Sequence, residues 1–130
     1  MKISEASKLS GLPAKTIRYY ESIGLFSSER QANGYREYHD EDVKQLRFVH
    51  RARQIGFSLD ECRDLLELLK DPHRASRNVK TLAQSRMQAI DEQIQNLMVM
   101  KELLSGLIQQ CPGNEESECA ILDNLVDEAR

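Results

Sequence analysis

Short apolar stripes alternate with polar residues at the start of the chain. Apolar positions at three-residue steps predict a helix over residues 5–9, which the hydroxyl of Ser4 can cap. Gly11 supplies a tight turn, and Pro13 suits the first turn of a second helix that runs to Gly24. Two short helices joined at a glycine predict a helix-turn-helix.

A hairpin and a further helix follow. Asn33-Gly34 is a strong signal for a tight hairpin because both residue types tolerate positive φ, so we expect a small wing. The next helix opens at Asp40 and ends at Gly56. Its apolar positions recur at three-residue steps, at Val43, Leu46, Val49, Ala52 and Ile55.

A fourth helix begins with a capping box. Ser58 and Glu61 have the spacing at which each side chain caps the backbone of the other, and Asp71-Pro72 stops the helix. One apolar face continues along it through Leu59, Cys62, Leu65, Leu66 and Leu69. The third and fourth helices therefore repeat the helix-turn-helix plan.

The longest uninterrupted pattern runs from about residue 78 to residue 110. Its seam positions alternate steps of four and three, as in a coiled coil, and all but one are apolar: Ala83, Met87, Ile90, Ile94, Leu97, Lys101, Leu104 and Ile108. So small a domain cannot bury such a seam, which predicts a homodimer. Lys101 interrupts the seam, either to set its register or because its ammonium reaches water. A short terminal helix is expected from Ala120 to Asp127.

Charge divides unevenly along the chain, whose formal net charge is −3. Residues 1–56 hold ten Lys and Arg against seven Asp and Glu, whereas residues 57–130 hold eight against fourteen. Phosphate contacts depend on where the basic side chains lie, because each local neutralisation releases counterions. The basic first part is therefore compatible with nucleic-acid binding despite the acidic total.

Length and motif content exclude several classes of protein. The 130 residues fit one compact domain, or a small domain with a helical arm. No run of eighteen apolar residues and no secretion-signal pattern occurs, so we expect a cytoplasmic protein. An enzyme is not expected, because the sequence has no general acid–base pair, nucleophile motif or glycine-rich phosphate loop.

Candidate DNA contacts gather in the second helix and the wing. In a helix-turn-helix the second helix enters the major groove, where its side chains reach a base edge or a phosphate. These candidates are Lys15, Thr16, Arg18, Tyr19 and Tyr20. Arg36 and Tyr38 flank the wing and can reach the adjacent DNA backbone. The alternative is a solvated basic helix with Tyr20 in the core.

Cys111 and Cys119 stand at the two ends of a seven-residue polar loop. Thiolates select soft ions such as Cu(I) or zinc over hard cations. Structural zinc requires four ligands, and two cysteines supply only half of that set. Ordinary free thiols or a disulfide are the alternative. Cys62 is expected in the core, because it lies on an apolar helix face.

Four segments together resemble the MerR family of metal-responsive transcriptional regulators, specifically its copper-efflux regulators of the CueR type. They are ISEASKLSGLPAKTIRYYESIGL, NGYREY, RFVHRARQIGFSLDE and CPGNEESEC. The resemblance implies a homodimer of winged helix-turn-helix domains joined by an antiparallel coiled coil. It also implies binding to a palindromic operator within a promoter. Metal would then bend and untwist the operator so that RNA polymerase can use the promoter.

The same resemblance assigns roles to residues of the metal site. Cys111 and Cys119 match the paired loop cysteines that hold Cu(I) in two-coordinate, linear geometry. Ser76 matches the position where zinc, cadmium, lead and mercury sensors of the family carry a third cysteine, so the resemblance implies that it is the metal-selectivity residue. A plain helix cap is the alternative role for Ser76. Ag(I) and Au(I) share the charge and softness of Cu(I) and are alternative effectors. An architectural DNA-binding protein without effector is the alternative from another class.

These observations predict a mostly α fold in three parts. A winged helix-turn-helix DNA-binding domain is expected over residues 1–70. A linker and dimerisation helix would occupy residues 71–110. A metal-binding loop with a short terminal helix would occupy residues 111–130.

Overall fold

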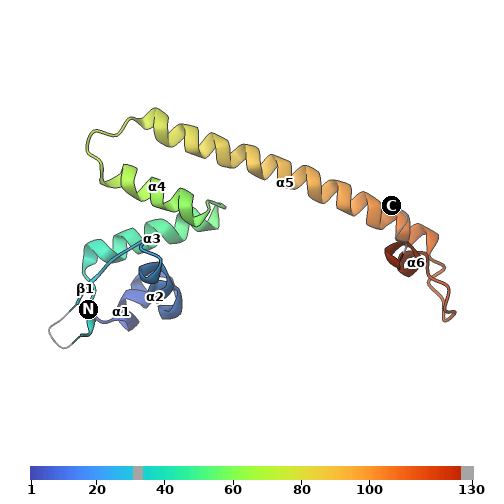
Figure 1. Ribbon diagram of the computed structural model, residues 1–130, viewed down its shortest axis with the longest axis horizontal. Coiled ribbons are helices and arrows are strands. Elements are labelled where there is room, and N and C mark those ends of the chain that lie inside the picture. Colours follow the sequence, from blue (N-terminus) through green and yellow to red (C-terminus); the bar gives the residue numbers. More distant parts are fainter. Residues whose placement is uncertain (31–33, 127–130) are drawn as a thin grey trace. The chain divides into compact units, whose positions relative to one another are not determined.

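A computed structural model describes residues 1–30 and 34–126 of the chain (Figure 1). These residues are mostly helical, which confirms the expected fold class. They form two compact units, Met1–Arg86 and Met87–Arg130. The proposed division at residues 70 and 110 stays a prediction.

The first two helices form the expected helix-turn-helix. Helix α1 spans Ile3–Ser10 and helix α2 spans Ala14–Ser22. Gly11 ends α1 with a φ of 82°, a left-handed conformation that favours glycine. The predicted cap by Ser4 is wrong, because α1 begins earlier, with Lys2 at the N-cap position and no side-chain cap bond.

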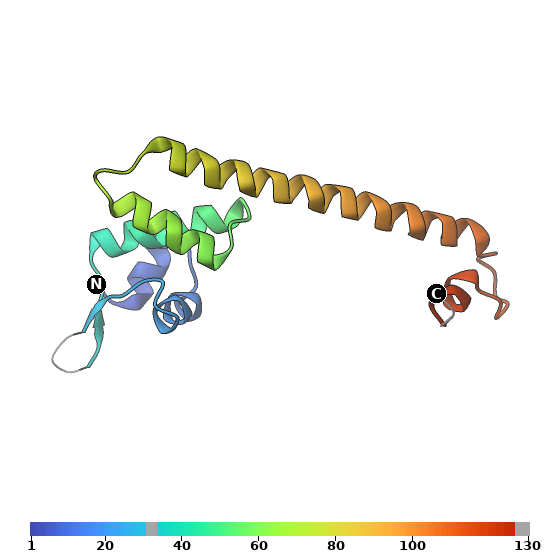
Figure 2. The same ribbon diagram turned by 45° about the horizontal axis from the view of Figure 1, so that its top comes forward.

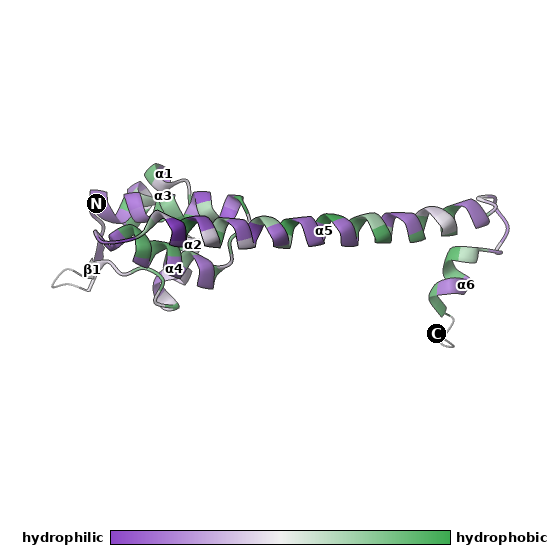
Figure 3. Ribbon diagram, turned by 90° about the horizontal axis from the view of Figure 1, so that it is seen from above, coloured by the Kyte–Doolittle hydropathy of each residue, from purple (hydrophilic) through white to green (hydrophobic). Residues whose placement is uncertain are grey.

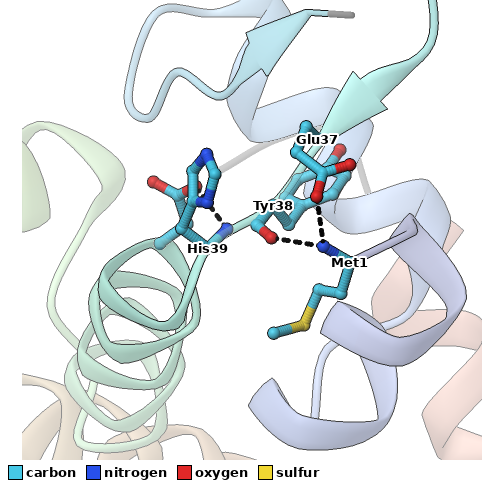
Figure 4. A network of polar contacts seen from close by, with 5 residues as sticks. Met1, Glu37, Tyr38 and His39 are labelled. Atoms are coloured by element: carbon cyan, nitrogen blue, oxygen red, sulfur yellow. Dashed lines mark hydrogen bonds and ion pairs between the residues drawn. The ribbon is translucent and has the colours of Figure 1, made fainter.

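The early start of α1 follows from a contact between the first residue and the wing (Figure 4). The Met1 amino group donates to the Tyr38 carbonyl at 2.7 Å and to Glu37 Oε1 at 2.8 Å. In return the Tyr38 N–H donates to the Met1 carbonyl at 2.9 Å. Because these bonds hold Met1 against the wing, the chain stays extended up to Lys2 and turns into helix at Ile3.

The wing is a two-stranded antiparallel sheet. Strand β1 is Glu29–Arg30 and strand β2 is Arg36–Glu37, with Arg30 opposite Arg36. Gly34 has a φ of 86°, as the hairpin prediction requires. The other residue of the predicted turn, Asn33, lies outside the described residues.

Helices α3 (Asp40–Gln54) and α4 (Leu59–Lys70) follow the wing (Figure 2). Together with α1 and α2 they bury the hydrophobic core of the first unit. The capping box at α4 is confirmed, with Glu61 N–H donating to Ser58 Oγ at 3.1 Å and Ser58 N–H donating to Glu61 Oε1 at 2.8 Å. Ile55 was expected on the apolar face but is 63% exposed. The reason is that α3 ends at Gln54, so the helical step no longer applies there.

Helix α5 spans Ser76–Gln110 and contains no buried residue. Figure 3 shows hydrophobic residues recurring along its length between hydrophilic ones. The large apolar side chains of the seam that are exposed are Met87, Ile94, Leu97, Leu104 and Ile108. The short helix α6 spans Ala120–Val126, and Asp127, its predicted last residue, lies outside the described residues. Among the described residues, no helix has the length and apolar character needed to cross a membrane.

Candidate functional site

The exposed face of α2 carries three of the predicted DNA-binding side chains. Lys15, Arg18 and Tyr19 are exposed, and Thr16 is half-buried beside them. Positions 15, 18 and 19 are three and four residues apart, so they share one side of the helix. This side combines two cations with a phenol, a set that suits phosphate oxygens and base edges.

Two predicted contact residues lie in the core. Tyr20 is 6% exposed and Tyr38 is 1% exposed. The Tyr38 ring stacks on Phe26 with centroids 6.2 Å apart. Burial, followed by a hydrogen bond to Glu21, raises the pKa of Tyr38 to about 12. The structure thus places both rings in the core and not on the exposed face of α2 or of the wing. For Tyr20 this is the alternative that the sequence left open.

Glu21 joins α2 to the wing and was not identified from the sequence. Its Oε1 accepts hydrogen bonds from the Tyr38 hydroxyl at 2.5 Å and the Ser28 hydroxyl at 3.2 Å. Its Oε2 pairs with Arg36 Nε at 2.7 Å. Arg36 therefore keeps a fixed direction while 28% of its side chain faces solvent. No local spacing rule could have found this cluster, because its members are seven to seventeen residues apart.

The two loop cysteines come together in the second unit. Cys111 follows the last residue of α5, and Cys119 precedes the first residue of α6. Both are free and half-buried, with their sulfurs 3.8 Å apart. A disulfide needs about 2.05 Å, so this is a dithiol. The loop carboxylates Glu115, Glu116 and Glu118 are exposed.

The backbone at the start of α6 favours a thiolate at Cys119. The Leu122 N–H, with contributions from Cys111 and the Ile121 N–H, lowers the pKa of the Cys119 thiol, although partial burial and Asp123 oppose this. The donor set fits one soft ion. Two metal–thiolate bonds of about 2.3 Å would span at most about 4.6 Å, so a small movement of either sulfur suffices.

The remaining metal-site predictions concern Ser76 and Cys62. Ser76 is the exposed first residue of α5. Cys62 is fully buried, and burial raises the pKa of its thiol, which confirms that it belongs to the core. Over residues 1–30 and 34–126, no three side chains of His, Cys, Asp or Glu converge on a possible metal position.

Comparisons with known proteins agree with this architecture. The family described as MerR HTH family regulatory protein matches residues 1–69, and the one described as MerR, DNA binding matches residues 43–107. The HTH-type transcriptional regulator HmrR of Rhizobium leguminosarum is 50% identical over 99% of this chain and 100% of its own length. The HTH-type transcriptional regulator CueR of Salmonella typhimurium is 40% identical over 96% of this chain and 91% of its own length.

A solved structure extends the likeness to three dimensions. The transcription regulator PbrR691 from Ralstonia metallidurans, in complex with lead(II), superposes with a TM-score of 0.83 at 30% sequence identity. The match covers 96% of this chain and 98% of that one. The winged helix-turn-helix domain, the long α5 and the short α6 thus occur together in a known protein.

Proposed function

We propose, since the chain belongs to the MerR HTH family of regulatory proteins, that it is a Cu(I)-responsive transcription regulator that activates metal-efflux genes. The family consists of DNA-binding transcription regulators and not enzymes, which confirms the expectation that the chain is not an enzyme. On this proposal the protein acts in the cytoplasm, where both its promoter and a reduced dithiol are available.

The dithiol of Cys111 and Cys119 is the observation that carries the copper assignment. Thiolates prefer soft ions, and the sulfurs are already 3.8 Å apart. Two thiolates with one monovalent ion leave a net charge of −1 and complete a two-coordinate set. A divalent ion would be neutralised by the same two thiolates, but it would lack the further ligands of its usual four-coordinate set. The lead(II) complex of PbrR691 supports the class of effector, a soft metal ion.

Ser76 is proposed to set the selectivity for a monovalent ion. It offers a neutral hydroxyl where divalent-ion sensors of the family are expected to carry a thiolate. An antiparallel pairing of two α5 helices would bring Ser76 of one subunit toward the cysteine loop of the other. The exposed seam of α5 supports this dimer, because apolar side chains at coiled-coil spacing gain free energy by leaving water.

The dimer is proposed to bind a palindromic operator within a promoter and to distort it when the ion is bound. Bending a site by tens of degrees costs about 1–6 kcal/mol. The ion must therefore favour the distorting conformation of the protein over the other by a comparable free energy. RNA polymerase would then use the realigned promoter.

The decisive experiment is transcription in vitro from a candidate efflux promoter with added Cu(I), Ag(I) or Zn(II). We expect Cu(I) to activate the wild type, Cys111→Ser to abolish the response, and Ser76→Cys to extend it to Zn(II). Cys62→Ala is the matched control, because it removes a thiol that lies outside the loop. An equal response of the wild type to Zn(II) and Cu(I) would contradict the monovalent assignment.

The alternatives give different outcomes in the same assay. A sensor of Ag(I) or Au(I) would respond to one of those ions at lower concentrations than to Cu(I). An architectural protein without effector would bind the promoter, but its transcription would not change with any ion or with Cys111→Ser.

A further inference from the structure

Glu21 is a buried carboxylate between the recognition helix α2 and the wing. Its side chain is 8% exposed, although it lies one residue before the end of α2. It contacts three donors: the Tyr38 hydroxyl, the Ser28 hydroxyl and Arg36 Nε, at 2.5, 3.2 and 2.7 Å. All three lie in or next to the strands of the wing, because Ser28 precedes β1, Arg36 is in β2 and Tyr38 follows β2.

A buried carboxylate lowers the stability of the folded protein unless its oxygens accept enough hydrogen bonds. The free-energy cost of removing a charge from water is offset only when hydrogen-bonding and charged partners are well placed. A buried ion pair is therefore weak evidence for stability by itself. Its better attested effect is to select one arrangement of the groups that it joins. Here those groups are α2, which carries Arg18, and β2, which carries Arg36.

The relative position of these two elements matters for reading DNA. A recognition helix reads base edges in the major groove, while contacts to the backbone set its register. The wing can supply backbone contacts in register only if its distance from the helix is constant. Glu21 spans this distance and is too buried to serve as a DNA contact itself.

We propose that Glu21 is a positioning residue for operator recognition, holding Arg36 and the wing in register with α2. This inference rests on the proposed function, because it assumes binding to a specific operator. It assigns to Glu21 a role in sequence discrimination and none in general affinity for DNA. The Tyr38 hydroxyl belongs to the same hydrogen-bonded cluster, since it donates to the Glu21 carboxylate.

The test compares two duplexes in binding titrations without metal. One is the duplex that the wild-type protein enriches from a random-sequence pool, and the other is a shuffled duplex of equal composition. Glu21→Gln is the principal variant, since the amide keeps an acceptor but loses the charge facing Arg36. Glu41→Gln is the matched control, because it makes the same change of charge at an exposed position of the same unit.

Charge alone predicts that both variants bind both duplexes somewhat more tightly, because a negative charge is lost near DNA. The positioning role predicts in addition that Glu21→Gln lowers the ratio of specific to shuffled affinity about tenfold, as expected from disrupting a hydrogen bond to a charged group. A merely structural defect would lower both affinities together. Tyr38→Phe, which removes only the hydroxyl, should lower the ratio about threefold and serves if Glu21→Gln fails to fold.

The outcomes separate the two proposals. If the wild type enriches no duplex, the proposed operator binding fails. If the wild type discriminates but Glu21→Gln, or Tyr38→Phe in its place, keeps a ratio within about twofold of Glu41→Gln, the positioning role of Glu21 is overturned.

Discussion

The turn between α3 and α4 allows a test of how the first part of α5 packs within the first unit. Gly56 has a φ of +95°, and a Cβ added there would lie 3.1 Å from Arg86 Nε and 3.3 Å from its Nη2. Arg86 belongs to α5, and its Nε is buried. Gly56→Ala therefore combines backbone strain with a steric conflict between the turn and α5.

The two contributions can be separated with a second glycine. Gly24 has a φ of +74°, and a Cβ there would meet no atom within 4 Å. A non-glycine residue in the left-handed region costs about 1–2 kcal/mol, and the reduced freedom of the unfolded chain offsets about 0.4–1 kcal/mol. Gly24→Ala should therefore lower the free energy of unfolding by about 1 kcal/mol.

Gly56→Ala should lower it further. At 3.1 Å the Arg86 side chain must retreat by a few tenths of an ångström, and an off-rotamer displacement costs about 0.5–1.5 kcal/mol. We expect a total loss of about 1.5–2.5 kcal/mol for Gly56→Ala. The double variant Gly56→Ala with Arg86→Ala should be more stable than the sum of its two single variants predicts, by about 0.5–1 kcal/mol.

The assay is equilibrium unfolding in urea followed by circular dichroism. All variants are compared at one protein concentration, because the apparent stability of a dimer depends on concentration. If Gly56→Ala is no more destabilising than Gly24→Ala, or if the double variant is additive to within about 0.3 kcal/mol, the Arg86 contact does not restrain the turn.

Three further results are expected. With iodoacetamide at neutral pH, Cys111 and Cys119 should react in the native protein. Cys62 should react only after unfolding, because burial protects it and raises the pKa of its thiol. Peptide mass spectrometry measures the alkylation of each cysteine, and three equally reactive thiols would contradict this prediction. Leu46→Ala should lower the free energy of unfolding by about 2–5 kcal/mol, since Leu46 is fully buried; a loss below about 1 kcal/mol in a urea titration would refute its place in the core. Ser58→Ala should cost about 1 kcal/mol, because it removes the cap of α4, and an unchanged melting temperature would show that the capping box is not needed.

Much of the helical framework was predictable because its signals are local. The Ser58 capping box lies within four residues of sequence, and the positive φ of Gly11 is a property of one residue. The pair Cys111 and Cys119 was also visible as two soft ligands flanking a short loop. The geometry of the pair was not predictable, because a disulfide and a dithiol can have the same spacing in sequence. The 3.8 Å distance between the two sulfurs distinguishes them.

By itself, the sequence determined the helices, the turn glycines, the basic first part of the chain and the soft-ligand pair, because each depends on residues close together along the chain. Only the tertiary structure decided that Tyr38 is a core residue, that α1 starts at Ile3, and that Glu21 binds Arg36. Those outcomes depend on groups that are distant in sequence and meet only when the wing folds onto α2. Burial and hydrogen bonding between such groups are collective properties of packing, which no local pattern encodes.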